Sequence, residues 1–143
     1  MQKGDLAGLV IVVAMLVGIA LFFVLAKQAP KVIYAPTEIT GSEVTVGELA
    51  SANSVKVTAE IKQAGFVAIH QAIGEAPGPI VGQSELLAAG SYVDFVIEAT
   101  ESLEPPAEHF ILLFVDDGDG VFESGIDLPV MSEGQVIKRK LSL

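Results

Sequence analysis

Five carboxylates lie close together in the sequence, within twelve residues that also contain three glycines. They belong to Asp116, Asp117, Asp119, Glu123 and Asp127. Calcium takes about six to eight oxygen ligands, mostly from carboxylates and carbonyls, and glycine allows the tight turn that gathers them. The sequence therefore predicts a site for calcium or another hard cation as its best candidate for chemistry.

The spacing of this acidic turn matches an EF-hand loop only in its middle. Such a loop has acidic residues at its first, third and fifth positions and a glutamate at its twelfth. When Asp117 and Asp119 take the third and fifth positions, Val115 and Ile126 fall at the first and the twelfth. A plain acidic turn is the alternative, because aspartate and glycine are common turn residues.

Two histidines and one serine are the other residues whose types suggest chemistry. His70 and His109 could bind zinc with a carboxylate if the fold brought them together across a sheet. A hydrogen-bonded structural role is the alternative for each. Ser84 does not fit a nucleophile elbow, which needs glycine where Leu86 stands. With no phosphate loop, dinucleotide fingerprint or zinc-protease helix either, we predict no enzymatic activity and no cofactor other than calcium.

Charge and cysteine content exclude further functions. The 143-residue chain has 18 acidic and 8 basic residues, a net charge of −10. Three basic residues and one acidic residue precede residue 32, which leaves 17 acidic and five basic residues, a net charge of −12, in residues 32–143. This charge repels nucleic acid. The chain has no cysteine, so disulfides and thiolate metal sites are excluded.

The segment Leu6–Ala26 is 21 residues long and contains neither a charge nor a proline. As a helix it would span about 31 Å, which matches the ~30 Å hydrocarbon core of a bilayer. We therefore predict one long N-terminal hydrophobic α-helix, within residues 1–27, that contacts the lipid bilayer or copies of itself through residues 6–26. A cleaved secretory signal is disfavoured, because the apolar part of such a signal has only about 7–15 residues.

The start of the chain has Lys3-Gly4 followed closely by this apolar segment, and in this it resembles a type IV pilin precursor. In such precursors a peptidase cuts after the glycine, so Gly4 and Asp5 would form the processing site. Many bacterial pilins carry phenylalanine and glutamate at the first and fifth mature positions, where this chain has Asp5 and Leu9. Archaeal pilins are less restricted at these positions, so Lys-Gly followed by an apolar helix suits them better. An uncleaved membrane anchor and a pilin-like helix therefore both remain open.

After the apolar segment, the sequence predicts a linker over residues 28–48 and an acidic β-domain over residues 49–143. Prolines and glycines in the first range are typical of a connector. In the second range, apolar residues alternate with polar ones, as in half-buried strands, and one continuous apolar run suits a strand covered on both faces. The fold class is therefore mainly β, an antiparallel β-sandwich of about seven strands behind the helix. The expected strands are residues 55–61, 66–73, 80–83, 92–98, 110–115 and 135–141. Residues 32–34 could be a further short strand or a contact with the membrane interface, where tyrosine is favoured.

Three finer expectations concern the course of the chain. Residues 75–79 should form a loop, because prolines there oppose regular structure. Residues 84–90 should form one helical turn ended by glycine. On the strand at 92–98, alternation predicts that Val93, Phe95 and Ile97 face inward.

Four motifs follow one another between Ser54 and Leu141. They are Gly65-Phe66-Val67-Ala68-Ile69-His70, Gly82-Gln83-Ser84-Glu85-Leu86-Leu87-Ala88-Ala89-Gly90, Val115-Asp116-Asp117-Gly118-Asp119-Gly120 and Asp127-Leu128-Pro129. Their order resembles a domain of uncharacterised function found in surface and secreted proteins of archaea and some bacteria. That family often has histidine where Val115 stands and an aromatic residue where Val130 stands. The resemblance implies an extracytoplasmic β-sandwich without a known catalytic activity.

Taken together, these features predict a non-enzymatic surface protein that crosses the cell membrane once and displays its domain in the extracytoplasmic space. Adhesion, envelope structure and ligand display are the roles such a protein would serve. The alternative is an extracellular filament subunit, in which copies of residues 6–26 pack as the core and the acidic domains cover the outside. No nucleic-acid partner is expected in either case.

Overall fold

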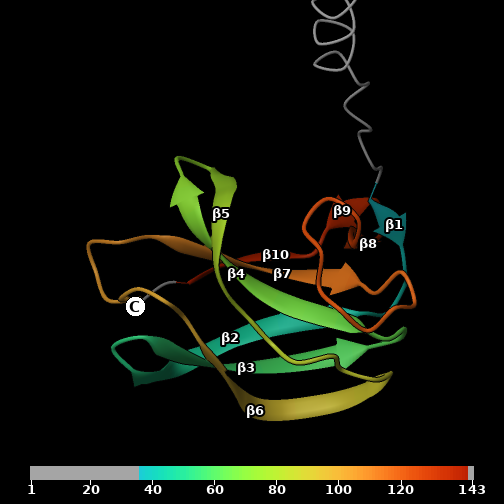
Figure 1. Ribbon diagram of the computed structural model, residues 1–143, viewed down its shortest axis with the longest axis horizontal. Coiled ribbons are helices and arrows are strands. Elements are labelled where there is room, and N and C mark those ends of the chain that lie inside the picture. The colour runs from blue at the N-terminus through green and yellow to red at the C-terminus, as the bar shows by residue number, and fades with distance from the viewer. Residues whose placement is uncertain (1–35, 142–143) are drawn as a thin grey trace, which may run out of the picture. The chain divides into compact units, whose positions relative to one another are not determined.

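The computed structural model describes residues 36–141, which form two β-sheets packed on each other as a sandwich (Figure 1). The larger sheet has seven strands, in the order β1-β8-β7-β4-β5, with β10 also paired to β7 and β9 to β8. The smaller sheet has the order β2-β3-β6. The strands are β1 (Thr37–Glu38), β2 (Glu43–Ser51), β3 (Ser54–Ile61), β4 (Gly65–Ile73), β5 (Ala76–Gln83), β6 (Gly90–Glu98), β7 (His109–Val115), β8 (Leu128–Ser132), β9 (Gln135–Val136) and β10 (Lys138–Leu141).

Strand β7 is the centre of the larger sheet, and every one of its residues is buried. One edge of β7 pairs with β4 along its whole length, and the other edge is shared by β10 and then β8. This arrangement confirms the sequence prediction that the apolar run at 110–115 is a strand covered on both faces. Such a strand needs apolar partners on each side of its sheet.

The two sides of the larger sheet carry separate apolar clusters. The main core lies between the sheets, where β3 contributes alternate residues that are almost completely buried. Its members are Val44, Val55, Val57, Ala59, Ile61, Val67, Ile69, Val81, Ile97, Ala99, Leu103, Ile111, Leu113, Val115, Val130, Ile137 and Leu141. A second cluster covers the outer face of the larger sheet and contains Ala68, Phe110, Leu112 and Phe114. We call this group the outer cluster.

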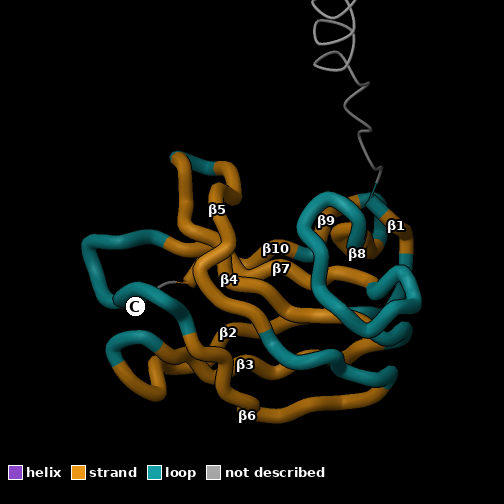
Figure 2. The backbone as a smooth tube through the Cα atoms, viewed as in Figure 1, coloured by secondary structure: helices purple, strands orange, loops and turns teal. Residues whose placement is uncertain are grey.

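The predicted fold class, a long helix followed by a sandwich of about seven strands, is corrected by the structure. The described residues form an all-β fold of ten strands, without any helix (Figure 2). Accordingly, nothing between residues 36 and 141 is a helix able to cross a bilayer. The segment predicted as a helix, Leu6–Ala26, and the short strand expected at 32–34 both lie outside the described residues. Part of the predicted linker, 28–48, belongs to the sandwich, because β1 and β2 use residues from that range.

The helical turn predicted at 84–90 is wrong, because this segment pairs with a distant strand instead. Gly65 and Leu87 exchange two backbone hydrogen bonds, 3.0 and 2.9 Å long, which hold the segment extended. The loop predicted at 75–79 is also wrong, because β5 runs from Ala76 and contains both prolines. It is an edge strand of the larger sheet, where a residue without an N–H group is tolerated.

A bulge in β6 reverses one of the inward-facing predictions. Phe95 lies opposite Val57, but the next pair places Tyr92 opposite Ala59, so β6 has one residue more than β3 between them. Asp94 has a φ of 51°, and its backbone N–H donates to the Thr58 hydroxyl at 3.2 Å. The extra residue shifts the alternation. Phe95 and Ile97 therefore face the core as predicted, whereas Val93 is 74% exposed.

Gly65 offers a test of how tightly β4 and β7 approach. A Cβ atom at Gly65 would lie 2.0 Å from the carbonyl oxygen of Phe114, which is backbone and cannot move aside. We expect Gly65→Ala to lower the free energy of unfolding by about 3 kcal/mol. At Gly74 a Cβ atom would meet nothing within 4 Å. There Gly74→Ala should cost only about 1 kcal/mol, for its left-handed backbone. Urea unfolding of a fragment beginning at Tyr34 measures both, and equal losses would contradict the close approach.

Candidate functional site

The acidic loop, residues 116–127, connects β7 to β8 and is held against the outer face of the larger sheet by one aromatic side chain. The Phe122 ring packs edge-on against Phe66 and Phe114, with centroid distances of 5.4 and 5.2 Å. Both partners lie on the face that carries the outer cluster. Sequence reasoning missed this anchor, although the one aromatic residue of the loop was a signal for it.

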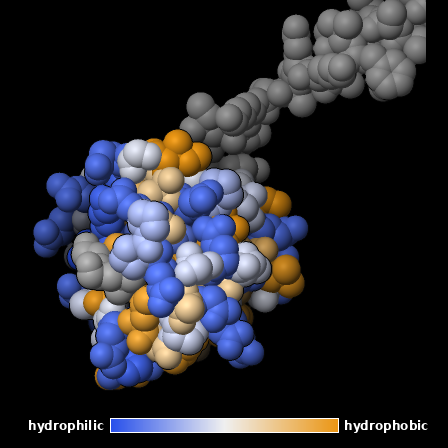
Figure 3. Space-filling model, turned by 90° about the vertical axis from the view of Figure 1, so that its left-hand side faces the viewer, coloured by the Kyte–Doolittle hydropathy of each residue, from blue (hydrophilic) through white to orange (hydrophobic). Residues whose placement is uncertain are grey.

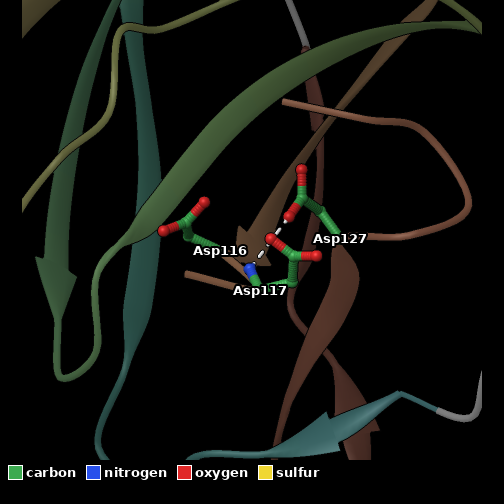
Figure 4. Close-up of side chains that lie close together, drawn as sticks. All are labelled: Asp116, Asp117 and Asp127. Carbon is green, nitrogen blue, oxygen red and sulfur yellow. Dashed lines mark hydrogen bonds between the residues drawn. The ribbon is translucent and has the colours of Figure 1, made fainter. Parts of the chain in front are cut away.

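The structure brings three of the five predicted ligands together. Oxygen atoms of Asp116, Asp117 and Asp127, one from each carboxylate, all lie within 4.8 Å of one another (Figure 4). Asp116 is half-buried, Asp117 is exposed and Asp127 is buried. Asp119 and Glu123 do not belong to this group. We call the three carboxylates the aspartate triad.

Asp127 closes the loop on itself. Its carboxylate accepts a hydrogen bond from the backbone N–H of Asp117 at 3.1 Å and another from that of Glu123 at 2.7 Å. The side chain is only 2% exposed, so these two donors compensate the burial of its charge. Since each donor comes from a different part of the loop, Asp127 sets the loop's shape whether or not a cation is present.

The other aspartates also accept hydrogen bonds from the backbone of the loop. Asp116 accepts from Gly120 at 3.0 Å, Asp117 from Asp119 at 3.2 Å, and Asp119 from Val121 at 2.8 Å. These are the local contacts by which aspartate stabilises turns. They favour the acidic-turn interpretation, because they hold the loop without a metal.

A cation nevertheless remains compatible with this geometry. A carboxylate oxygen that accepts one N–H still has a second lone pair for a ligand. Three carboxylates so close together repel one another, and a bound divalent cation would relieve that repulsion. The triad offers fewer oxygens than the about six to eight that calcium takes, so water and loop carbonyls would have to complete the shell.

Comparison with known proteins assigns the domain that carries this loop. Residues 35–142 match the family described as "Domain of unknown function (DUF7282)". The chain belongs to the DUF7282 family. No curated protein and no solved structure matches it. The resemblance to an uncharacterised β-rich domain is thus confirmed. The pilin-like interpretation receives no support from these comparisons, and its processing site, Gly4 and Asp5, lies outside the described residues.

The two histidines of the DUF7282 domain cannot share one metal ion. In the pairing of β4 with β7, His70 lies opposite Phe110, and His109 lies opposite Gln71. Residues opposite each other point to the same face, and neighbours along a strand point to opposite faces. His70 therefore faces the outer side of the larger sheet and His109 the inner side. The zinc alternative for this pair is wrong.

Each histidine instead makes a structural hydrogen bond. His70 is stacked on Phe114, and its Nδ1 lies 2.7 Å from the carbonyl oxygen of Gly78 in β5. Burial lowers the pKa of His70 below its ordinary value, against a smaller opposing effect of that hydrogen bond. His109 is completely buried, and its Nε2 lies 3.0 Å from a carboxylate oxygen of Glu101.

Ser84 also has a structural task in this DUF7282 domain. Its hydroxyl accepts the backbone N–H of Val67 at 3.0 Å and donates to the carbonyl of Glu85 at 2.8 Å. The backbone N–H of Ser84 in turn donates to the carbonyl of Val67. The serine therefore continues the pairing with β4 beyond the end of β5.

Calcium binding by the aspartate triad has a direct test. We expect millimolar calcium to raise the unfolding temperature of the fragment beginning at Tyr34, because a ligand at about ten times its Kd stabilises the native state by ~1.4 kcal/mol. Asp116→Asn should remove this increase. Asp119→Asn should keep it, because Asp119 lies outside the triad. Asp127 is unsuitable for substitution here, since its loss would disrupt the loop itself. Calorimetry without heat of binding, together with an unchanged unfolding temperature, would leave only the acidic-turn interpretation.

The lowered pKa of His70 predicts acid sensitivity. Between its pKa in the folded domain and about 6.5, the unfolded chain binds more protons, so the free energy of unfolding falls with decreasing pH, by at most about 1.4 kcal/mol per pH unit. His70→Gln retains a hydrogen-bonding side chain but does not titrate. We therefore expect the variant to lose less stability than the wild type between about pH 7.5 and pH 5.5. Equal losses in urea unfolding would show that carboxylates alone cause the acid sensitivity.

Proposed function

We propose that this protein is a non-enzymatic surface protein, held in the cell membrane by its apolar segment and displaying the DUF7282 domain in the extracytoplasmic space. The observation that carries the proposal is the juxtaposition in one chain of the uncharged segment Leu6–Ala26 and a domain of opposite character. The segment suits a bilayer core. Residues 32–143, with a net charge of −12, favour an aqueous environment.

The surface of the domain supports display in an aqueous, ion-rich medium. Hydrophilic side chains cover most of the face drawn in Figure 3. An excess of one charge keeps proteins apart, and salt screens the repulsion that would otherwise oppose folding. The sequence contains no cysteine, so the domain relies on its own core outside the cell. Adhesion, envelope structure and ligand display all fit such a domain.

Several polar groups that could perform catalysis make structural hydrogen bonds instead, and this supports a non-enzymatic role. Ser84 pairs with the backbone of Val67, and Asp127 with the backbone of its own loop. His70 and His109 are buried on opposite faces of one sheet. A nucleophile and a base within reach of each other are the usual signature of covalent catalysis, and these residues offer no such pair.

A filament subunit is the second candidate, and the observation that favours it is Lys3-Gly4 just before the apolar segment. In that case the segment would leave the bilayer after cleavage and pack against its own copies. Packing rather than hydrophobicity governs such association, because lipid tails and neighbouring apolar segments are about equally apolar. The acidic domains would then cover the filament.

The intact mass of the protein, isolated from the cell surface, distinguishes these proposals. We expect the uncleaved protein, because an anchor has no need of processing. A chain beginning at Asp5, together with filaments in negative-stain images of sheared cells, would favour the second candidate.

Protease treatment of intact cells tests the location of the domain. This treatment should remove residues 36–141 from the membrane fraction. A domain protected until the cells are lysed would contradict extracytoplasmic display.

A further inference from the structure

The tip of the β4–β5 hairpin exposes an apolar side chain that belongs to neither apolar cluster of the domain. Ile73, the last residue of β4, is 65% exposed. It is followed by exposed residues of which only Glu75 carries a charge, while Ala76 and Pro77 add apolar surface. An isolated exposed isoleucine is ordinary. Its place at the end of a projecting hairpin is what calls for an explanation.

The hairpin projects on the side of the larger sheet where the described chain begins. Figure 1 shows the β4–β5 hairpin and β1 rising on that side, whereas β6 lies on the far side of the sandwich. Only residues 27–36 separate the apolar segment from β1. Ten residues reach at most ~36 Å when fully extended. If the apolar segment lies in a bilayer, the start of β1 stays within that distance of it.

The charge around the hairpin differs from that of the rest of the domain. Three of the five basic residues after residue 32 lie in β10, and one of them, Lys138, contacts the hairpin. The Lys138 ammonium group donates to the carbonyl oxygen of Glu75 at 3.0 Å. The Lys140 ammonium group lies 2.8 Å from the carboxylate of Glu108. Two lysines thus offset two glutamates here, so this surface lacks the strong negative charge that would repel lipid headgroups.

We propose that the tip of the β4–β5 hairpin contacts the surface of the bilayer that holds Leu6–Ala26, with Ile73 entering the headgroup region. The lysines of β10, paired with groups of the domain itself, reduce the repulsion between this surface and the lipid phosphates. This inference rests on the membrane anchoring proposed above. Exposed apolar side chains at a membrane surface gain by leaving water, and lysine stems with charged ends suit the same boundary.

The chain contains no tryptophan, so a single introduced tryptophan reports on its own surroundings. The test compares Ile73→Trp with Val93→Trp in the full chain, reconstituted in vesicles of phosphatidylcholine with some phosphatidylglycerol. Both sites are exposed in the domain, at 65% and 74%, so neither substitution disturbs the core. Val93 lies on β6, in the sheet away from β1. Each variant is measured with ordinary lipids and with lipids that carry a bromine quencher near the headgroup.

We expect the emission of Ile73→Trp to shift to the blue in vesicles and to be largely lost with brominated lipid. The emission of Val93→Trp should stay that of a water-exposed tryptophan and resist the quencher. Equal quenching of both variants, or of neither, would overturn the hairpin contact. A blue shift at position 73 without lipid quenching would overturn it too, since a second copy of the chain would then cover the tip.

Flotation of the same vesicles in a density gradient distinguishes the hairpin contact from the membrane anchoring on which it rests. Protein that floats with the lipid but shows no quenching at position 73 contradicts the hairpin contact and leaves the anchor intact. Protein that stays at the bottom of the gradient contradicts the anchor, and the hairpin contact with it.

Discussion

Strand β7 has buried side chains on both of its faces, and the domain is organised around covering them. On the inner face, Ile111 and Leu113 need the smaller sheet. On the outer face, Phe110, Leu112 and Phe114 need cover from elsewhere. Removing one large apolar side chain from water stabilises the fold by about 1.5–3 kcal/mol, so neither face can be left open. A two-sheet sandwich covers only the first face, and loops and a hairpin must cover the second.

The acidic loop owes its position to that second requirement. Phe122 joins the outer cluster and draws the loop over the sheet, and Asp127 then closes the loop by accepting two backbone N–H groups. The aspartate triad is thus built on an apolar contact and a buried carboxylate, both of which exist without a ligand. This explains how a loop with so much negative charge keeps one shape.

Sequence periodicity predicted the strands that are half-buried or wholly buried, because burial leaves a direct trace in the pattern of apolar residues. The strand at 55–61 and the run at 110–115 were both recognised in this way. Two of the errors have one cause in common, namely pairing with a distant strand. Leu87 is extended because Gly65 binds it, and Val93 is exposed because Asp94 bulges against β3. Neither partner is near in the sequence.

By itself, the sequence determined that residues 32–143 are acidic, free of cysteine and rich in strands, and it singled out five carboxylates as the best candidate for cation chemistry. Composition and local spacing suffice for these conclusions. Only the tertiary structure decided that three of those carboxylates meet, and that His70 and His109 are kept on opposite faces. The reason is physical: strand register and the packing of Phe122 set which side chains approach one another, and both depend on residues far apart along the chain.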